Sequence, residues 1–300
     1  MSFKYLDALE KFLRATNDTT EINETLGTDI DEAGFINYNV GEENFQKYNI
    51  FRKLATFLNV SKTDGKILVP VSDDIAGIME ENAPFPVSEH EFEEKGFSSY
   101  KLGTIVKVKQ DFISDYSFNL INYLDSELAK RFGKAEERLM LNGSGNKEPL
   151  GLLNQDLSCF VANDLSYDAI IDFYFSLSKE YRDNACFIVS DEIAIELRKL
   201  KDSDGNYIWN QNNDTILRKP VYVSSYMNDE TKPILFGDFS YLSVILRGKM
   251  KLKVRVIRKQ VWNWLCGQRT LRFQINASRC SQGITSRLIR RKRRLSEFRG

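Results

Sequence analysis

Residues 114–153 have the sequence SDYSFNLINYLDSELAKRFGKAEERLMLNGSGNKEPLGLL. Apolar residues recur there at steps of three or four, which places them on one face of a helix. They are Phe118, Ile121, Leu124, Leu128, Phe132, Ala135 and Leu139. Ser114 or Asp115 can cap the start of this helix, because a short side-chain oxygen accepts from the free N–H groups of the first turn. The pattern predicts one long amphipathic helix.

This helix runs from Asp115 to Met140 in the prediction, about 39 Å at 1.5 Å per residue. Gly133 interrupts it and costs about 1 kcal/mol relative to Ala, so we expect close packing or a gentle bend there. Gly143 suits the left-handed residue that follows a helix. A loop rich in Gly, Asn and Pro follows over Asn142–Gly151. The stretch alone indicates a core helix followed by a turn.

The composition is that of a folded protein large enough for one large domain or two ordinary ones. Of 300 residues, 42% are hydrophobic and 12% aromatic, which is not a disordered composition. No apolar run approaches the ~18 residues that span a bilayer. The N-terminus lacks the basic and then apolar order of a secretory signal. We therefore expect synthesis in the cytosol.

A net charge of zero conceals two oppositely charged parts. Residues 247–300 contain 17 Lys and Arg and one acid, Glu297, so they carry +16. Residues 1–246 therefore carry −16. Such asymmetry is typical of a chain with charged partners. We expect the acidic body to limit adhesion to polyanions such as DNA.

The first third of the chain contains little regular periodicity. Residues 1–16 predict a short amphipathic helix, and residues 17–44 an acidic, extended arm. Residues 45–60 predict a second short helical or mixed segment. Residues 61–110 predict two strands joined by a long acidic connection, the second strand over 98–110, where apolar residues alternate. A connection of this length usually has a function in binding.

Shorter elements alternate after the long helix. Helices are expected over 167–177 and 191–200, a turn at 202–206, and strands over 185–189, 220–223, 234–236, 243–246 and 251–257. The pattern predicts mixed helices and strands without the regular period of a doubly wound sheet. The fold class is therefore α+β.

No motif indicates catalysis, a cofactor or a metal site. His90 is the single histidine, and it lies in the acidic connection, where a rigid catalytic base is not expected. The sequence NGSGNK at 142–147 follows a helix C-terminus, the wrong pole of the dipole for a phosphate. Asp202 and Asp204 begin a loop that lacks the terminal Glu of a calcium site. The four cysteines lack paired spacing for zinc or disulfides. We assign no catalytic, cofactor-binding or metal residue, and expect a binding or structural protein.

The order of five stretches resembles the major capsid protein family of tailed bacteriophages, of the Hong Kong 97 type. These stretches are NIFRKLATFLNV (49–60), YKLGTIVKVKQDFISDYS (100–117), ELAKRFGKAEERLMLNGSGNKEPLGLL (127–153), DNACFIVSDEIAIELRKLKDSDGNYIW (183–209) and KPVYVSSYMNDETKPILFGDFS (219–240). No single motif is specific, but the ordered series covers about 200 residues. The resemblance implies the Hong Kong 97-type capsid fold.

The resemblance also implies a division of the chain. It comprises an N-terminal helix and arm (1–44), the start of a peripheral domain (45–60), an extended loop (61–110), the peripheral domain with its spine helix (111–166), an axial domain (167–236), return strands (237–258) and an atypical basic tail (259–300). Some family members link a loop Lys to a neighbour's Asn. Lys62, Lys66 and Lys95 lie in the corresponding region, but nothing selects one of them.

The implied function is that of a non-enzymatic head protein of a phage or prophage. Its copies would form hexamers and pentamers of an icosahedral shell around double-stranded DNA, bound without sequence specificity. The resemblance further implies a virion location, no membrane contact, and a portal and maturation protease as partners. Two alternatives remain: an encapsulin-like bacterial nanocompartment shell that encloses cargo enzymes, and a nucleic-acid-binding protein acting through its Arg-rich tail.

The two ends of the chain depart from the family pattern. Residues 1–16 are short for the helical scaffolding segment of many members, so we expect a separate scaffolding protein. Residues 259–300 are Arg-rich and weakly periodic where the family has a glycine-containing strand and an Asp-Gly turn. Three interpretations of this tail are open: a frameshifted end, a genuine basic tail that binds nucleic acid or an acidic partner, and a divergent strand pair.

Overall fold

The computed structural model describes residues 10–11, 36–38, 40–60, 65–70, 92–97, 99–115, 117–155, 157–162, 164–227, 234–257, 262–275 and 284–289. Glu10 and Lys11 are helical. The rest of the expected N-terminal helix, and the arm as far as residue 35, lie outside the described residues. No helix within the described residues has both the length and the apolar character to cross a bilayer.

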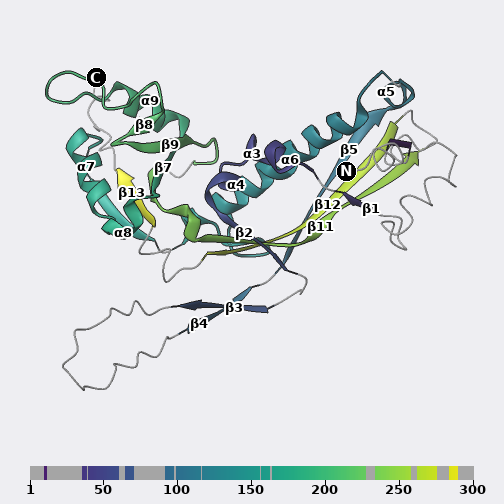
Figure 1. Ribbon diagram of the computed structural model, residues 1–300, viewed down its shortest axis with the longest axis horizontal. Coiled ribbons are helices and arrows are strands. Elements are labelled where there is room, and N and C mark those ends of the chain that lie inside the picture. The colour runs from purple at the N-terminus through teal and green to yellow at the C-terminus, as the bar shows by residue number, and fades with distance from the viewer. Residues whose placement is uncertain are drawn as a thin grey trace, which may run out of the picture.

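A long helix lies along one side of a strongly elongated sheet, which we call the peripheral sheet (Figure 1). Its strands in order are β1 (Ile36–Tyr38), β11 (Leu242–Ile257), β12 (Trp262–Ile275) and β5 (Tyr100–Lys109), and β2 (Thr56–Val60) also pairs with β11. The helix is α6 (Leu120–Asn142), 23 residues or about 35 Å long. Its apolar stripe packs on Val106 and Val108 of β5, so these two elements share a core.

The long helix begins later than the sequence predicted. Residues Gln110–Ser114 form a separate short helix, α5, and neither Ser114 nor Asp115 caps α6. The Asp115 carboxylate instead accepts from the backbone N–H of Ser117 at 2.9 Å, and this local turn separates the two helices. The cap of α6 is Asn119, whose side chain accepts from the N–H of Asn122.

Two glycines of the long stretch allow close contacts. At Gly133 an added Cβ would lie 3.1 Å from Cβ of Tyr48, which confirms the expected close packing. Gly143 ends α6, but its φ of −54° is not left-handed, so that prediction was wrong. A Cβ there would lie 1.9 Å from the carbonyl oxygen of Pro149, so the following loop folds back tightly onto the helix end. Space, and not backbone conformation, requires glycine at this position.

A second sheet and the helices beside it, which we call the axial part, lie at the opposite end of the molecule from α5 (Figure 1). Its strand order is β6 (Ser158–Ala162), β13 (Ile284–Ile289), β10 (Ile234–Gly237), β7 (Cys186–Val189), β9 (Lys219–Val223) and β8 (Thr215–Ile216). Three helices pack against this sheet: α7 (Tyr167–Phe175), α8 (Lys179–Arg182) and α9 (Asp191–Lys199). Ser166 and Ser190 cap α7 and α9 by accepting from backbone N–H groups. This sheet also uses β6 and β13, from outside residues 167–236.

Strand β7 joins the axial and peripheral parts. Phe187 and Val189 point into the core beneath α7 and α9. Cys186 and Ile188 point into a different core, which contains Met140 at the end of α6. All four residues are buried, because a strand with cores on both faces alternates between them. The two parts of the subunit are therefore packed as one body.

The projecting hairpin consists of β3 (Gly65–Pro70) and β4 (Phe92–Phe97), which pair with each other in an antiparallel register (Figure 1). The second strand that we expected in this region does exist as β5. It pairs with β12 in the peripheral sheet, however, and not with β3. Residues 92–97, which we expected to be loop, supply the true partner.

The remaining elements refine the sequence predictions. Residues 45–60 divide into parts of α3 (Glu42–Gln46), α4 (Phe51–Leu54) and β2, and short 3₁₀ turns lie at Leu152–Asn154 and Phe239–Tyr241. The two strands predicted over 243–257 are one strand, β11, with an irregularity where Gly248 has φ +64°. The tail contributes β12, between β11 and β5, and β13, between β10 and β6.

Candidate functional site

The residues considered for chemistry do not come together. His90 lies outside the described residues. The 142–147 loop follows the C-terminus of α6, and the Asp202 carboxylate accepts from the backbone N–H groups of Asp204 and Asn206, as in a plain turn. Among the described residues, no group of three or more His, Cys, Asp or Glu could hold a metal ion. Burial, with a smaller effect of Asp238, raises the pKa of the Cys186 thiol to about 12, which makes it unreactive.

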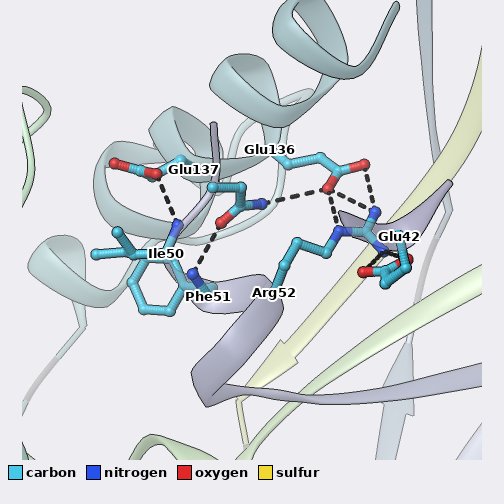
Figure 2. Close-up of polar contacts among 7 residues, drawn as sticks. Glu42, Ile50, Phe51, Arg52, Glu136 and Glu137 are labelled. Carbon is cyan, nitrogen blue, oxygen red and sulfur yellow. Dashed lines mark hydrogen bonds and ion pairs between the residues drawn. The ribbon is translucent and has the colours of Figure 1, made fainter. Parts of the chain in front are cut away.

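The main polar cluster of the described residues is a buried ion pair between α4 and α6 (Figure 2). Arg52 donates from Nε to Glu136 at 2.9 Å and from Nη2 to both carboxylate oxygens at 2.8 and 2.7 Å. The side chains are 1% and 0% exposed. Asn49 also donates to Glu136, at 3.3 Å. A forked, charge-assisted pair of this kind fixes orientation as well as distance.

Aromatic rings enclose the guanidinium of this pair. Its carbon lies 4.5 Å from the ring centre of Phe45 and 4.3 Å from that of Phe57. Its Nη1 reaches Glu42 at 3.2 Å, at the start of α3. Because Arg is planar and weakly hydrated, it tolerates such a position better than Lys would. Arg52 thus connects α3, β2 and α6.

Glu137, the next residue of α6, connects three parts of the subunit. One oxygen accepts from the N–H of Ile50 at 3.0 Å, and the other accepts from the hydroxyl of Ser224, directly after β9. Nearby, Asn142 donates to the carbonyl of Tyr226 at 2.6 Å. The backbone just before α4, the long helix α6 and the segment that follows β9 therefore meet at one junction, which we call the Glu137 junction.

Our sequence analysis missed this junction, although a signal was present. Glu136 lies four residues after Phe132 and three before Leu139, so it occupies the apolar stripe of the helix. A carboxylate on a buried stripe requires a partner. That partner, Arg52, is 84 residues away, and helical periodicity cannot identify it.

The Glu137 carboxyl predicts a dependence of stability on pH. Burial raises its pKa, and the hydrogen bonds from Ser224 and Ile50 and the charge of Lys134 oppose this only in part. A carboxyl with a higher pKa in the folded state favours folding most below its unfolded pKa, and that contribution disappears as the pH rises through the folded value. Ionised Glu137 therefore costs stability at neutral pH.

We expect Glu137→Gln to be more stable relative to wild type at pH 7 than at pH 4.5, with a difference of about 1 kcal/mol. The amide can still accept from Ile50 and donate to Ser224. Urea unfolding at the two pH values measures this. Glu43→Gln removes a charge at an exposed position and is the control. If the free energy of unfolding of Glu137→Gln changes between the two pH values as much as that of wild type does, the raised pKa of Glu137 is contradicted.

The exposed surface contains features expected of a subunit that contacts its copies. In the described residues β3 and β4 pair only with each other, and Lys66 pairs with Glu94 across them. Lys66 is therefore ion-paired, whereas Lys62 and the side chain of Lys95 lie outside the described part of the chain. Large apolar side chains are exposed on the axial part: Val161, Phe175, Ile195 and Tyr207. An isolated two-stranded ribbon and such side chains both favour contact with another surface.

Comparisons with known proteins agree with this geometry. The model of the phage capsid family matches residues 42–272. A solved structure titled "Capsid of empty GTA particle computed with C5 symmetry" has 22% identity and a TM-score of 0.67, covering 80% of this chain and 89% of that one. A structure from Microbacterium phage Oxtober96 has 13% identity and a TM-score of 0.60, covering 89% and 99%.

A third structure, titled "Satellite phage P4 procapsid including size determination (Sid) protein", has 10% identity and a TM-score of 0.56, covering 82% and 96%. A search of curated proteins finds no match. The structural likenesses confirm the Hong Kong 97-type capsid fold. The family model covers more than three quarters of the chain, and we conclude that this protein belongs to the phage capsid family.

Proposed function

We propose that this chain is the major head protein of a phage or prophage, whose copies form pentamers and hexamers of an icosahedral shell around double-stranded DNA. The observation that carries the proposal is the family match over residues 42–272, in a subunit whose hairpin pairs only with itself among the described residues. Head-to-tail contacts that close by rotation produce such rings.

The proposed role is structural and not enzymatic. Family membership and the absence of a catalytic pattern in the sequence support this. We further propose a portal, a maturation protease and a separate scaffolding protein as partners, with synthesis in the host cytoplasm and a final location in the virion. The solved procapsid that includes a size determination protein shows that a related fold assembles with an accessory protein.

We propose that the tail, residues 259–300, is native sequence and that it contributes β12 and β13 to the fold. Two observations support this: the family match continues to residue 272, and β12 and β13 each lie between two other strands. The alternative is a frameshifted end. Translation of the other two reading frames across codons 255–300 tests it, since an Asp-Gly turn with apolar alternation in another frame would support the frameshift.

Expression of the full chain and electron microscopy of the purified protein test the function. We expect closed particles of uniform diameter that sediment far ahead of a 34.7 kDa monomer. A protein that stays monomeric at high concentration, with its hairpin resistant to protease, would refute the proposal. Particles that enclose a specific cargo enzyme would instead indicate a nanocompartment shell.

A further inference from the structure

The peripheral sheet differs in charge from the rest of the subunit. Its three long strands contain three Lys or Arg in β5, five in β11 and two in β12, and no Asp or Glu. By contrast, residues 61–97 contain nine acids and three Lys. The sheet thus combines three lysines from the acidic part of the chain with seven basic residues from residues 247–300.

The pleat of β5 separates an apolar side from a basic one. Tyr100, Leu102, Thr104, Val106 and Val108 are buried or half-buried, whereas Lys101, Gly103, Ile105, Lys107 and Lys109 are exposed. The first set faces α6, because Val106 and Val108 belong to the core of that helix. The exposed lysines therefore lie on the other side of the sheet, away from α6.

The strand register extends this basic side across the sheet. Lys101 pairs with Thr270, which pairs with Arg247, and Gly103 pairs with Gln268, which pairs with Lys251. Directly paired residues lie on the same side of an antiparallel sheet, and Arg247 and Lys251 are exposed like Lys101. Each such set of residues paired across the three strands forms a row. In the backbone register, the next two rows run from Ile105 to Lys253 and from Lys107 to Arg255.

We propose that this side of the peripheral sheet, which we call the basic face, binds the phosphate backbone of duplex DNA and is the side of the shell wall that faces the packaged DNA. This inference rests on the proposed function. The four rows described above and a fifth, which begins at Lys109, are about 6.7 Å apart and span about 27 Å. This length matches about 8 base pairs at 3.4 Å each. Contacts of this kind carry no base specificity.

The acidic hairpin of a neighbouring copy is the competing occupant. Two observations disfavour it. The sequence of β3, GKILVP, is mostly apolar, so a ribbon built from it requires an apolar surface and not a row of lysines. In addition, Glu94 of β4 already pairs with Lys66 of its own hairpin. DNA is a polyanion, and the three long strands that form this face contain no Asp or Glu that would repel its phosphates.

The test uses the full-length protein and a fluorescent 30-base-pair duplex of random sequence at several salt concentrations. The variant is Lys101→Glu/Lys107→Glu/Lys109→Glu. The control is Lys53→Glu/Lys130→Glu/Lys134→Glu, which makes the same change in net charge at exposed lysines of α4 and α6. Both retain the basic tail, so its contribution cancels.

We expect the variant to bind at least about tenfold more weakly at 0.1 M salt, with its log–log salt slope shallower by about 3, and the control to change much less. Equal losses in variant and control would overturn the inference, as would an unchanged slope. Loss of particles with unchanged DNA affinity of the dilute subunit would assign the face to a neighbouring copy instead.

Two further measurements keep these outcomes distinct. Thermal unfolding followed by circular dichroism shows whether each variant is folded. If the triple Glu variant does not fold, the triple Gln variant at the same three positions replaces it. Its salt slope is expected to change in the same direction. Electron microscopy of wild type tests the proposed function separately. If wild type forms particles and the variant binds DNA as wild type does, only the proposal for the basic face is refuted. If wild type never assembles, the proposed shell function is refuted.

Discussion

Replacing Arg52 with Ala is expected to lower the free energy of unfolding by about 3–5 kcal/mol, the usual cost of removing one partner of a buried pair. Glu136 would be left as a buried charge that has lost its three hydrogen bonds from Arg52, while Asn49 still donates to it at 3.3 Å. The rings of Phe45 and Phe57 would also lose the guanidinium between them. Urea unfolding of the dilute subunit, followed by circular dichroism, measures the change.

Two variants show whether burial is the cause. Arg131→Ala removes an arginine from the exposed pair with Glu127, and we expect a loss of about 0–1 kcal/mol. Arg52→Met combined with Glu136→Leu removes both charges of the buried pair and is expected to recover most of the loss. If Arg52→Ala costs no more than Arg131→Ala, the pair is not buried as described.

Replacing residues 65–97 with a short Gly-Ser linker is expected to abolish closed particles while leaving the melting temperature of the subunit within about 3 °C of wild type. The strands of this segment pair only with each other in the described part of the chain, so the cores lose little. A ribbon that does not stabilise its own subunit is expected to act between subunits.

Electron microscopy and differential scanning calorimetry of the same preparations measure these two effects. The double variant Lys66→Ala/Glu94→Ala is the control, because it removes an exposed ion pair and keeps the ribbon. It should still form particles. Particles of normal size from the linker variant would show that assembly does not use the hairpin, and a large fall in melting temperature would show that the hairpin belongs to the core.

Local patterns predicted the existence of elements better than their limits. The long helix was predictable because its apolar residues follow the helical period over more than five turns. Its start was not, because Asp115 forms a turn with Ser117 and leaves the cap to Asn119. Asp and Asn suit both structures, and only the surrounding packing selects between them.

Pairing between distant strands was beyond local inference. Alternation identified β5 as a strand, but its partner β12 lies more than 150 residues later, in the tail that composition marked as atypical. Similarly, Glu136 was visible on the apolar stripe, whereas Arg52 was not identifiable as its partner. The basic face required both alternation within β5 and the register of three strands, so it emerged only from the structure.

The shared strand β7 has a consequence for changes in shell diameter. Its residues complete the cores of both halves of the subunit, and the Glu137 junction lies beside them. Bending of the subunit at β7 would expose residues of both cores and would also break the buried hydrogen bonds of Glu137. We therefore expect the curvature of an assembled particle to change by rotation of whole rigid subunits about their contacts, with little deformation inside each one.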